Sequence, residues 1–112
     1  AHLFDSLHPA VLQAIQLIVD CAHRNGKSVS ICGEMAGDPV AAILLLAMGV
    51  DGLSMNASSL PRVKWTIRNF THQQALSLLE LARRSSSASD TRKLLNQALD
   101  QAGLGGLLRP GK

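Results

Sequence analysis

The chain has 112 residues, of which 46% are hydrophobic, so it can close one core and is no disordered tail. Eleven Lys and Arg against eight Asp and Glu leave a formal net charge of +3, and aromatic residues make up only 3%. These values argue against nucleic acid as a partner, because that role needs a dense basic stripe or aromatic stacking platforms. The longest apolar run, Val40 to Met48, is far shorter than the roughly 20 residues that cross a bilayer, so no membrane association is expected.

Cysteine usage and the start of the chain indicate a cytoplasmic protein with reduced thiols. Cys21 and Cys32 show neither CxxC spacing nor companion histidines at zinc-finger intervals, so we expect no disulfide and no structural zinc site. The first residues lack the basic and apolar regions of a secretory signal. The chain begins with Ala1 instead of Met, which suggests a piece of a longer polypeptide or a processed product.

Apolar periodicity predicts a helix from Leu7 to about Arg24, followed by a short strand. Ser6 and Pro9 suit the first turn of this helix. Asn25-Gly26 ends it, and Ser28 to Cys32 reads as the strand. The apolar positions that recur at three- and four-residue spacing, and that we expect on the inward face, are Val11, Ala14, Ile15, Ile18, Val19 and Ala22.

A loop from Gly33 to Gly37 is expected to lead into a buried helix. Asp38-Pro39 is a good helix start, because Asp caps free amides and Pro fits the first helical position. The helix from Val40 to Met48 is apolar all round, which predicts burial on most sides, and Gly49 ends it. A second short strand is expected from Gly52 to Met55.

Three further helices are predicted in the second half of the chain. The first runs from Leu60 to about Asn69, and Thr71 to Gln74 has capping-box spacing for the next. Ser85 to Ser89 is a low-complexity connection to the last helix, from roughly Asp90 to Ala102, and the glycine-rich tail spans residues 103–112. The expected inward residues of the last two helices are Ala75, Leu78, Leu79 and Ala82, then Leu94, Leu95, Ala98 and Leu99.

The order of these elements predicts an α/β fold with two short parallel strands and about five helices. Parallel strands are buried on both faces and need neighbouring strands, so two of them under five helices would leave open edges and an uncovered apolar face. We therefore expect the end of a larger α/β domain.

A thiol stands where the first predicted strand ends, in the segment SICGEMAGDP. Strand ends of this kind carry catalytic groups in α/β barrels, although a lone cysteine there is also common as core packing. Gly33 and Gly37 let backbone pass close to a ligand, and the helix start at Pro39 favours a nearby anion. Glu34 is near enough in sequence to hold or tune the thiol. The segment fits a site for a small anionic substrate.

Two long motifs, ICGEMAGDP and LSMNASSLPRVKWTIR, resemble the closing part of the phosphoenolpyruvate-binding barrel of phosphoenolpyruvate-protein phosphotransferases, enzyme I of the sugar phosphotransferase system. FDSLHPAVL and GLGGLLRPGK resemble the nitrogen-related paralogue. A shorter Cys-Gly-Glu version also occurs in pyruvate phosphate dikinases and phosphoenolpyruvate synthases, which remain an alternative. The resemblance implies that residues 1–112 are the C-terminal part of a (β/α)8 barrel of TIM type.

The resemblance also implies a reaction. Phosphoenolpyruvate gives its phosphoryl group to a histidine on another domain, which passes it to a small histidine-bearing carrier protein, and pyruvate enolate stays in the barrel. Cys32 maps onto the cysteine that protonates this enolate at carbon, a task suited to a thiol because thiols are mostly protonated at pH 7. Gly33 is expected to bring a backbone amide toward the substrate, and Glu34 to orient the thiol.

The rest of the implied machinery would precede Ala1: the phosphoacceptor histidine, the arginine clamp on the substrate, and the carboxylates that bind Mg²⁺. No metal ligand is therefore assigned in this chain, which is expected to be inactive in isolation. Turn, cap or surface positions are expected for its histidines and for three aspartates, namely His2, His8, His23 and His72, and Asp5, Asp38 and Asp51.

Three features of the sequence each allow two interpretations. Ser54, Met55 and Asn56 follow the second strand and either contact substrate or a neighbouring subunit, or serve as core filler and turn former. Arg62, Lys64 and Arg68 could form a phosphate-binding face around Trp65, but a solvated helix surface with Trp65 packed inward is favoured. The open sheet edges and apolar helices also fit a homodimer, or an association module without catalysis.

Overall fold

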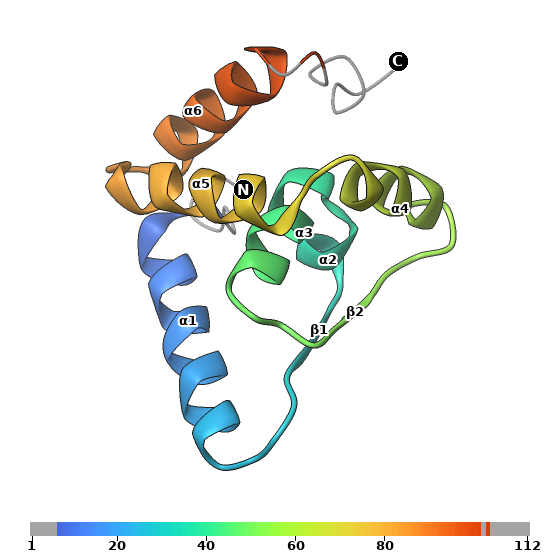
Figure 1. Cartoon of the computed structure of the whole chain (residues 1–112), viewed down its shortest axis with the longest axis vertical. Coiled ribbons are helices and arrows are strands. Elements are labelled where there is room, and N and C mark those ends of the chain that lie inside the picture. The colour runs from blue at the N-terminus through green and yellow to red at the C-terminus, as the bar shows by residue number, and fades with distance from the viewer. Residues whose placement is uncertain (1–6, 102, 104–112) are drawn as a thin grey trace.

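The computed structural model describes residues 7–101 and 103, which form six helices and two short strands (Figure 1). Strands β1 (Ser30–Cys32) and β2 (Gly52–Ser54) pair in parallel, with Ser30 beside Gly52 and Cys32 beside Ser54. The predicted α/β class with two parallel strands is confirmed. The helices are α1 (Pro9–Arg24), α2 (Glu34–Gly37), α3 (Pro39–Ala47), α4 (Leu60–Arg68), α5 (His72–Arg84) and α6 (Ala88–Gln101).

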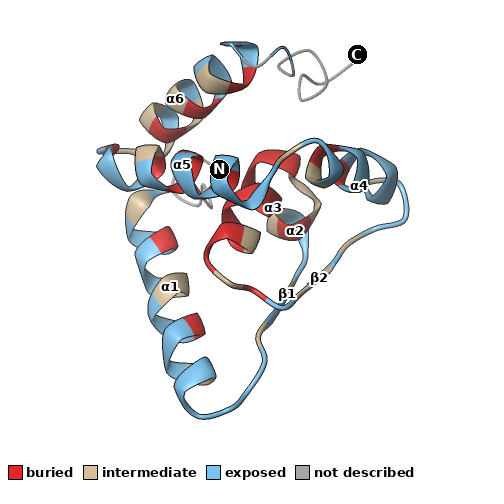
Figure 2. Ribbon diagram, in the orientation of Figure 1, coloured by how far each residue is buried: buried red, intermediate tan, exposed pale blue. Residues whose placement is uncertain are grey.

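Helix α3 forms the centre of the packing. Its start is as predicted: Asp38 accepts a hydrogen bond from the Val40 amide at 3.1 Å, and Pro39 occupies the first turn. Every residue of α3 except Leu46 is buried, because α2, α4 and α5 all contact it. Figure 2 shows this concentration of buried residues on α3. Gly49, with φ of 99°, turns the chain away after the helix, as expected of a glycine in that position.

Helices α5 and α6 confirm most of the pattern read from the second half of the chain. Thr71 and Gln74 form the expected capping box, and the four predicted inward residues of α5 are buried. Leu95 and Leu99 of α6 are buried as well. Helix α6 begins two residues earlier than predicted, because Ser87 Oγ accepts a hydrogen bond from the Asp90 amide and so caps the helix from within the serine run. The predicted tail, apart from Gly103, lies outside the described residues.

Helix α1 buries a narrower face than predicted. Leu12 and Val19 are buried, whereas Val11 and Ile18 are 38% and 59% exposed, and Leu17 is 66% exposed. The prediction for Val11, Ala14 and Ile18 was wrong, since all three are exposed: α1 packs chiefly against α5, and one neighbouring helix covers only one stripe. The expected Ser6 lies outside the described residues, and His8 caps the helix instead, since its Nδ1 accepts from the Ala10 amide at 3.0 Å.

Two local predictions also need correction. The segment Gly33–Gly37 is not a plain loop, because residues 34–37 form the short helix α2, held by the buried Ala36. A four-residue helix is too short to show apolar periodicity in sequence. Trp65 does not pack inward but is 42% exposed, because the inward face of α4 is formed by Val63 and Thr66. Within the described residues, no helix is both long and apolar enough to cross a bilayer.

Asp51 ties the end of α1 to the strands. Its Oδ2 accepts a hydrogen bond from the Val29 amide at 2.8 Å and lies 2.8 Å from Nε2 of His23. The hydrogen bond with His23, followed by that with the Val29 amide, lowers the pKa of Asp51 from its ordinary value of 3.8. His23 and Asp51 thus take structural positions, as the sequence predicts.

The sign of this pKa shift predicts how stability depends on pH. Because the folded pKa lies below 3.8, the Asp51 carboxylate stabilises the fold above that pH, and the contribution is lost as pH falls through the folded pKa. We expect Asp51→Asn to lower the melting temperature at pH 7 and to differ less from the parent chain at pH 3. Thermal unfolding followed by circular dichroism measures this. Asp20→Asn, an exposed carboxylate on α1, is the control, and a gap between parent and Asp51→Asn that is equal at both pH values contradicts the prediction.

Candidate functional site

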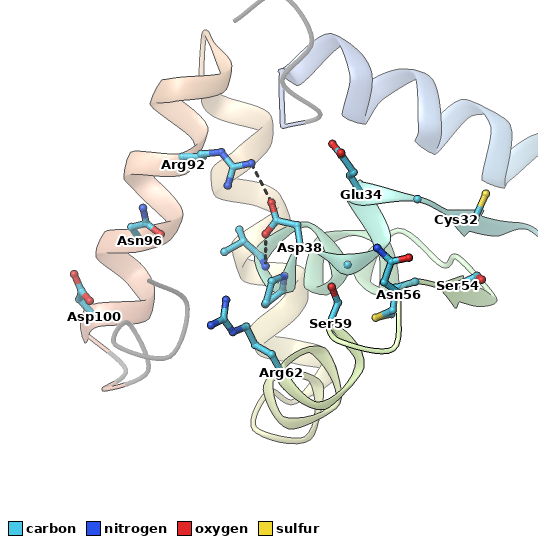
Figure 3. Close-up of a pocket in the computed structure, with 15 residues that line it drawn as sticks. Cys32, Glu34, Asp38, Ser54, Asn56, Ser59, Arg62, Arg92, Asn96 and Asp100 are labelled. Atoms are coloured by element: carbon cyan, nitrogen blue, oxygen red, sulfur yellow. Dashed lines mark hydrogen bonds and ion pairs between the residues drawn. The ribbon is translucent and has the colours of Figure 1, made fainter. Parts of the chain in front are cut away.

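A cavity of about 890 Å³ opens where the two strands end. Parallel strands present their carboxyl ends at one edge of a sheet, so the register partners Cys32 and Ser54 lie next to each other there. Both line the cavity. In Figure 3 they lie at one end of the group of lining residues, and Arg92, Asn96 and Asp100 of α6 lie at the other.

Cys32 is the last residue of β1, and its side chain is exposed. A sulfur that exchanges a proton with a bound ligand must be reachable from a cavity, and Cys32 meets this condition. The next residue, Gly33, has φ of 94° and ψ of −158°, a conformation that is essentially restricted to glycine. This turn lets the chain leave the strand and start α2 at once. A Cβ at Gly33 would meet nothing within 4 Å, so the glycine is needed for its backbone angles and not for space.

Glu34 is the first residue of α2, and it is exposed and lines the same cavity. The structure therefore brings Cys32, Gly33 and Glu34, the three residues singled out in sequence, to one cavity wall. The hydrogen bonds and ion pairs within the described residues do not join Glu34 to Cys32. The prediction that Glu34 orients the thiol is therefore not supported by a contact among the described residues.

Asp38 connects the motif segment to α6. One carboxylate oxygen accepts from the Val40 amide, and the other lies 3.0 Å from a guanidinium nitrogen of Arg92 (Figure 3). Both side chains are partly buried. Asp38 thus acts as a helix cap, as predicted, and also as an ion-pair partner, which the sequence did not indicate.

The segment after β2 also reaches the cavity. Ser54, Met55 and Asn56 line it, as the substrate-contact interpretation of this segment requires. Gly37 packs closely on Ser59, since a Cβ at Gly37 would lie 3.2 Å from Ser59 Oγ. The end of α2 and the start of α4 therefore lie against each other beside the cavity.

Basic residues near the cavity come from two helices. Arg62 of α4 lines the cavity, but Lys64 and Arg68 do not, so the three basic residues do not form one phosphate-binding face. Arg92, Asn96 and Asp100 of α6 also line it, although no site role was predicted for them. Their spacing of four residues, offset from Leu95 and Leu99, was a readable sign of a second helix face.

The lining carboxylates do not make a metal centre by themselves. Among residues 7–101 and 103, no group of three His, Cys, Asp or Glu side chains is placed to hold a metal ion. We assign magnesium no ligand among these residues.

The first 72 residues, which include the Cys32 segment and β2, match the family of PEP-utilising enzymes at their PEP-binding domain, PEP being phosphoenolpyruvate. The chain therefore belongs to this family of phosphoenolpyruvate-utilising enzymes. Apart from Arg92, Asn96 and Asp100 of α6, the residues that line the cavity lie within the part of the chain that matches this phosphoenolpyruvate-binding domain.

Several curated relatives have names that are more particular. A Salmonella typhimurium protein named phosphoenolpyruvate-dependent phosphotransferase system is 37% identical over 111 residues, which cover 99% of this chain and 15% of the relative. Its namesake in Escherichia coli is 36% identical over 111 residues, again 99% and 15%. A phosphoenolpyruvate-protein phosphotransferase of Haemophilus influenzae is 41% identical over 99 residues, 88% of this chain and 17% of the relative. The chain thus spans about a sixth of the length of these relatives.

The backbone at Gly33 generates a stability prediction. Gly33→Ala forces a residue with a Cβ into glycine-only backbone angles, so it should lower the free energy of unfolding by about 1–3 kcal/mol. It should also move the exposed Cys32 thiol and change its rate of reaction with a disulfide reagent. Urea unfolding and thiol titration in a Cys21→Ser background measure the two effects.

Gly26→Ala is the matched control. Gly26 also has a positive φ, 70°, and a Cβ there would likewise meet nothing within 4 Å, but this glycine lies in the turn after α1. The substitution should cost stability without changing the Cys32 reaction rate. A Gly33→Ala variant with the same free energy of unfolding as the parent chain would contradict the prediction, because the turn could then accept a side chain without strain.

Proposed function

We propose that this chain is the C-terminal part of the phosphoenolpyruvate-binding barrel of a phosphoenolpyruvate-protein phosphotransferase of the nitrogen-related branch, and that Cys32 protonates pyruvate enolate there. The observation that carries the proposal is the exposed Cys32 thiol at the end of β1, on the wall of the cavity. The names of the relatives that align over nearly the whole chain support the phosphotransferase over a dikinase or a synthase.

The proposed reaction has two steps, phosphoryl transfer to a histidine and protonation of the enolate that remains. The bond between phosphorus and the enol oxygen of phosphoenolpyruvate breaks as the phosphoryl group passes to a histidine of another domain. The electron pair left on that oxygen makes the enolate of pyruvate. The S–H bond of Cys32 then breaks, its proton goes to the terminal carbon, and pyruvate and a thiolate result. Because Cys32 is exposed, the thiolate can regain its proton from water.

The neighbouring residues have supporting tasks in this proposal. Gly33 turns the backbone at the strand end, so that its amide can approach the substrate without a side chain in between. Glu34 and the polar groups after β2 line the remaining wall and limit how the three-carbon ligand can lie. The phosphoacceptor histidine, the arginine clamp and the magnesium ligands would come from parts of the enzyme outside this chain, and a small histidine-bearing protein would receive the phosphoryl group.

The role of Cys32 is tested by Cys32→Ala in the complete enzyme. Loss of a general acid should lower the rate of pyruvate formation by about 10²–10⁴-fold, while binding of phosphoenolpyruvate stays near that of the parent enzyme. A coupled assay for pyruvate and a binding titration measure the two quantities. Cys21→Ala is the matched control, because Cys21 is also exposed but lies on α1 away from the cavity. Pyruvate formation at the normal rate in Cys32→Ala would reject the general-acid role.

A second candidate function, association with another copy of the chain, is favoured by one observation. Helix α1 exposes Leu17 and Ile18, together with part of Val11, and large apolar side chains grouped on one helix mark contact surfaces. We expect the chain to sediment as a dimer at tens of micromolar if this face pairs, and Ile18→Glu to shift it to the monomer. Lys93→Glu, an exposed change on another helix, is the control. A parent chain that sediments as a monomer at that concentration argues against association.

A further inference from the structure

Helix α6 has two faces with different tasks. Leu95 and Leu99 are buried and join the hydrophobic core. Arg92, Asn96 and Asp100, each four residues apart, line the cavity that holds Cys32. The same helix is therefore both a part of the core and a polar wall of the cavity (Figure 3). It lies beyond residues 1–72, the part of the chain that matches the phosphoenolpyruvate-binding family.

One direct link between this wall and the Cys32 segment is the ion pair of Arg92 with Asp38. The pair spans 3.0 Å and joins residues 54 positions apart in sequence. Asp38 uses its other oxygen to cap α3, whose residues are almost all buried. Arg92 therefore holds a carboxylate that also caps the nearly fully buried helix α3.

Helix α2 connects Cys32 to Asp38, and little within α2 itself fixes it. It has only four residues, and the hydrogen bonds from the Gly37 amide to the Gly33 carbonyl and from the Asp38 amide to the Met35 carbonyl are both long, at 3.3 Å. A helix this short is not stable alone, so its place depends on its anchors. These are the buried Ala36, Met35 packed against the core, the close contact of Gly37 with Ser59, the strand end at Cys32 and the Asp38 junction.

We propose that Arg92 is a positioning residue of the Cys32 site, and that α6 is the wall that keeps the segment from Gly33 to Asp38 in place. Arg92 acts through Asp38 and does not itself touch the reacting atoms. When the pair is broken, Asp38 still caps α3 but its side chain and the end of α2 gain freedom. The Gly33 amide and Glu34, at the other end of that segment, then lose their fixed position relative to Cys32.

The structural part of this inference is tested by hydrogen exchange of the amides in residues 33–38. Arg92→Ala should speed this exchange by up to about fivefold, the upper end of the effect expected for a partly exposed ion pair. Arg92→Lys should restore part of the protection, since an ammonium group keeps the charge but not the planar geometry. Lys93→Ala, the exposed neighbour on α6, should change nothing. Equal exchange in Arg92→Ala and Lys93→Ala overturns the proposal.

A double-mutant cycle separates the ion pair from a general loosening of α6. Asp38→Asn keeps an oxygen that can cap α3 but loses the charge that Arg92 binds. If the pair is the link, Asp38→Asn and Arg92→Ala combined should speed exchange no more than either change alone. Effects that multiply would show that the two residues act independently and would contradict the inference.

The catalytic consequence rests on the proposed function. In the complete enzyme, Arg92→Ala should lower kcat for pyruvate formation several-fold with a smaller change in KM, because the segment supplies the proton donor, whereas the proposed arginine clamp and magnesium ligands that bind the substrate lie outside this chain. Normal kcat together with faster exchange would refute positioning for catalysis while leaving Cys32 as the acid. Normal kcat in Cys32→Ala would instead remove the proposed function, and the exchange result would still decide whether Arg92 holds the segment.

Discussion

The structure depends on the burial of α3. This helix has no polar side chain, so it is stable in water only when other elements cover it on several sides. Helices α2, α4 and α5 supply the cover, and each of them therefore takes its position from α3. The shape of the cavity depends on this arrangement, because α2 and the start of α4 form two of its walls. A change deep in α3 would thus reach the site through packing, without touching any lining residue.

The second constraint is the parallel pairing of β1 and β2. It places the ends of both strands at one edge, and so brings together Cys32 and Ser54, which are 22 positions apart in sequence. The turn at Gly33 then sends the chain into α2 at once, instead of letting the strand run on past the cavity. The positions of the side chains at this edge are therefore set by the backbone, through the strand pairing and the turn at Gly33.

The features that the sequence predicts correctly are those with a local physical cause. The cap at Asp38, the capping box at Thr71 and the apolar run of α3 are local signals with strong physical causes, and they were predicted correctly. The Cys32 segment was also placed correctly at a strand end, and the structure shows that this end lies beside a cavity. The exposed side of α1 and the outward Trp65 were not foreseen, because periodicity shows which residues are apolar but not whether a neighbour exists to cover them. The Arg92–Asp38 pair was out of reach for a similar reason, since it depends on how α6 folds back over residues far away in sequence.

The exposed face of α1 links the two candidate functions. Leu17 and Ile18 are open to solvent in the described residues, and each of the two strands has one edge without a partner strand there. A barrel would complete the sheet at these edges and set a further helix beside α1, which would cover the same apolar side chains. A second copy of the chain would need that surface to be free. If the chain is part of a closed barrel, as proposed, the neighbouring barrel helix and a second copy of the chain would therefore compete for the same apolar face of α1.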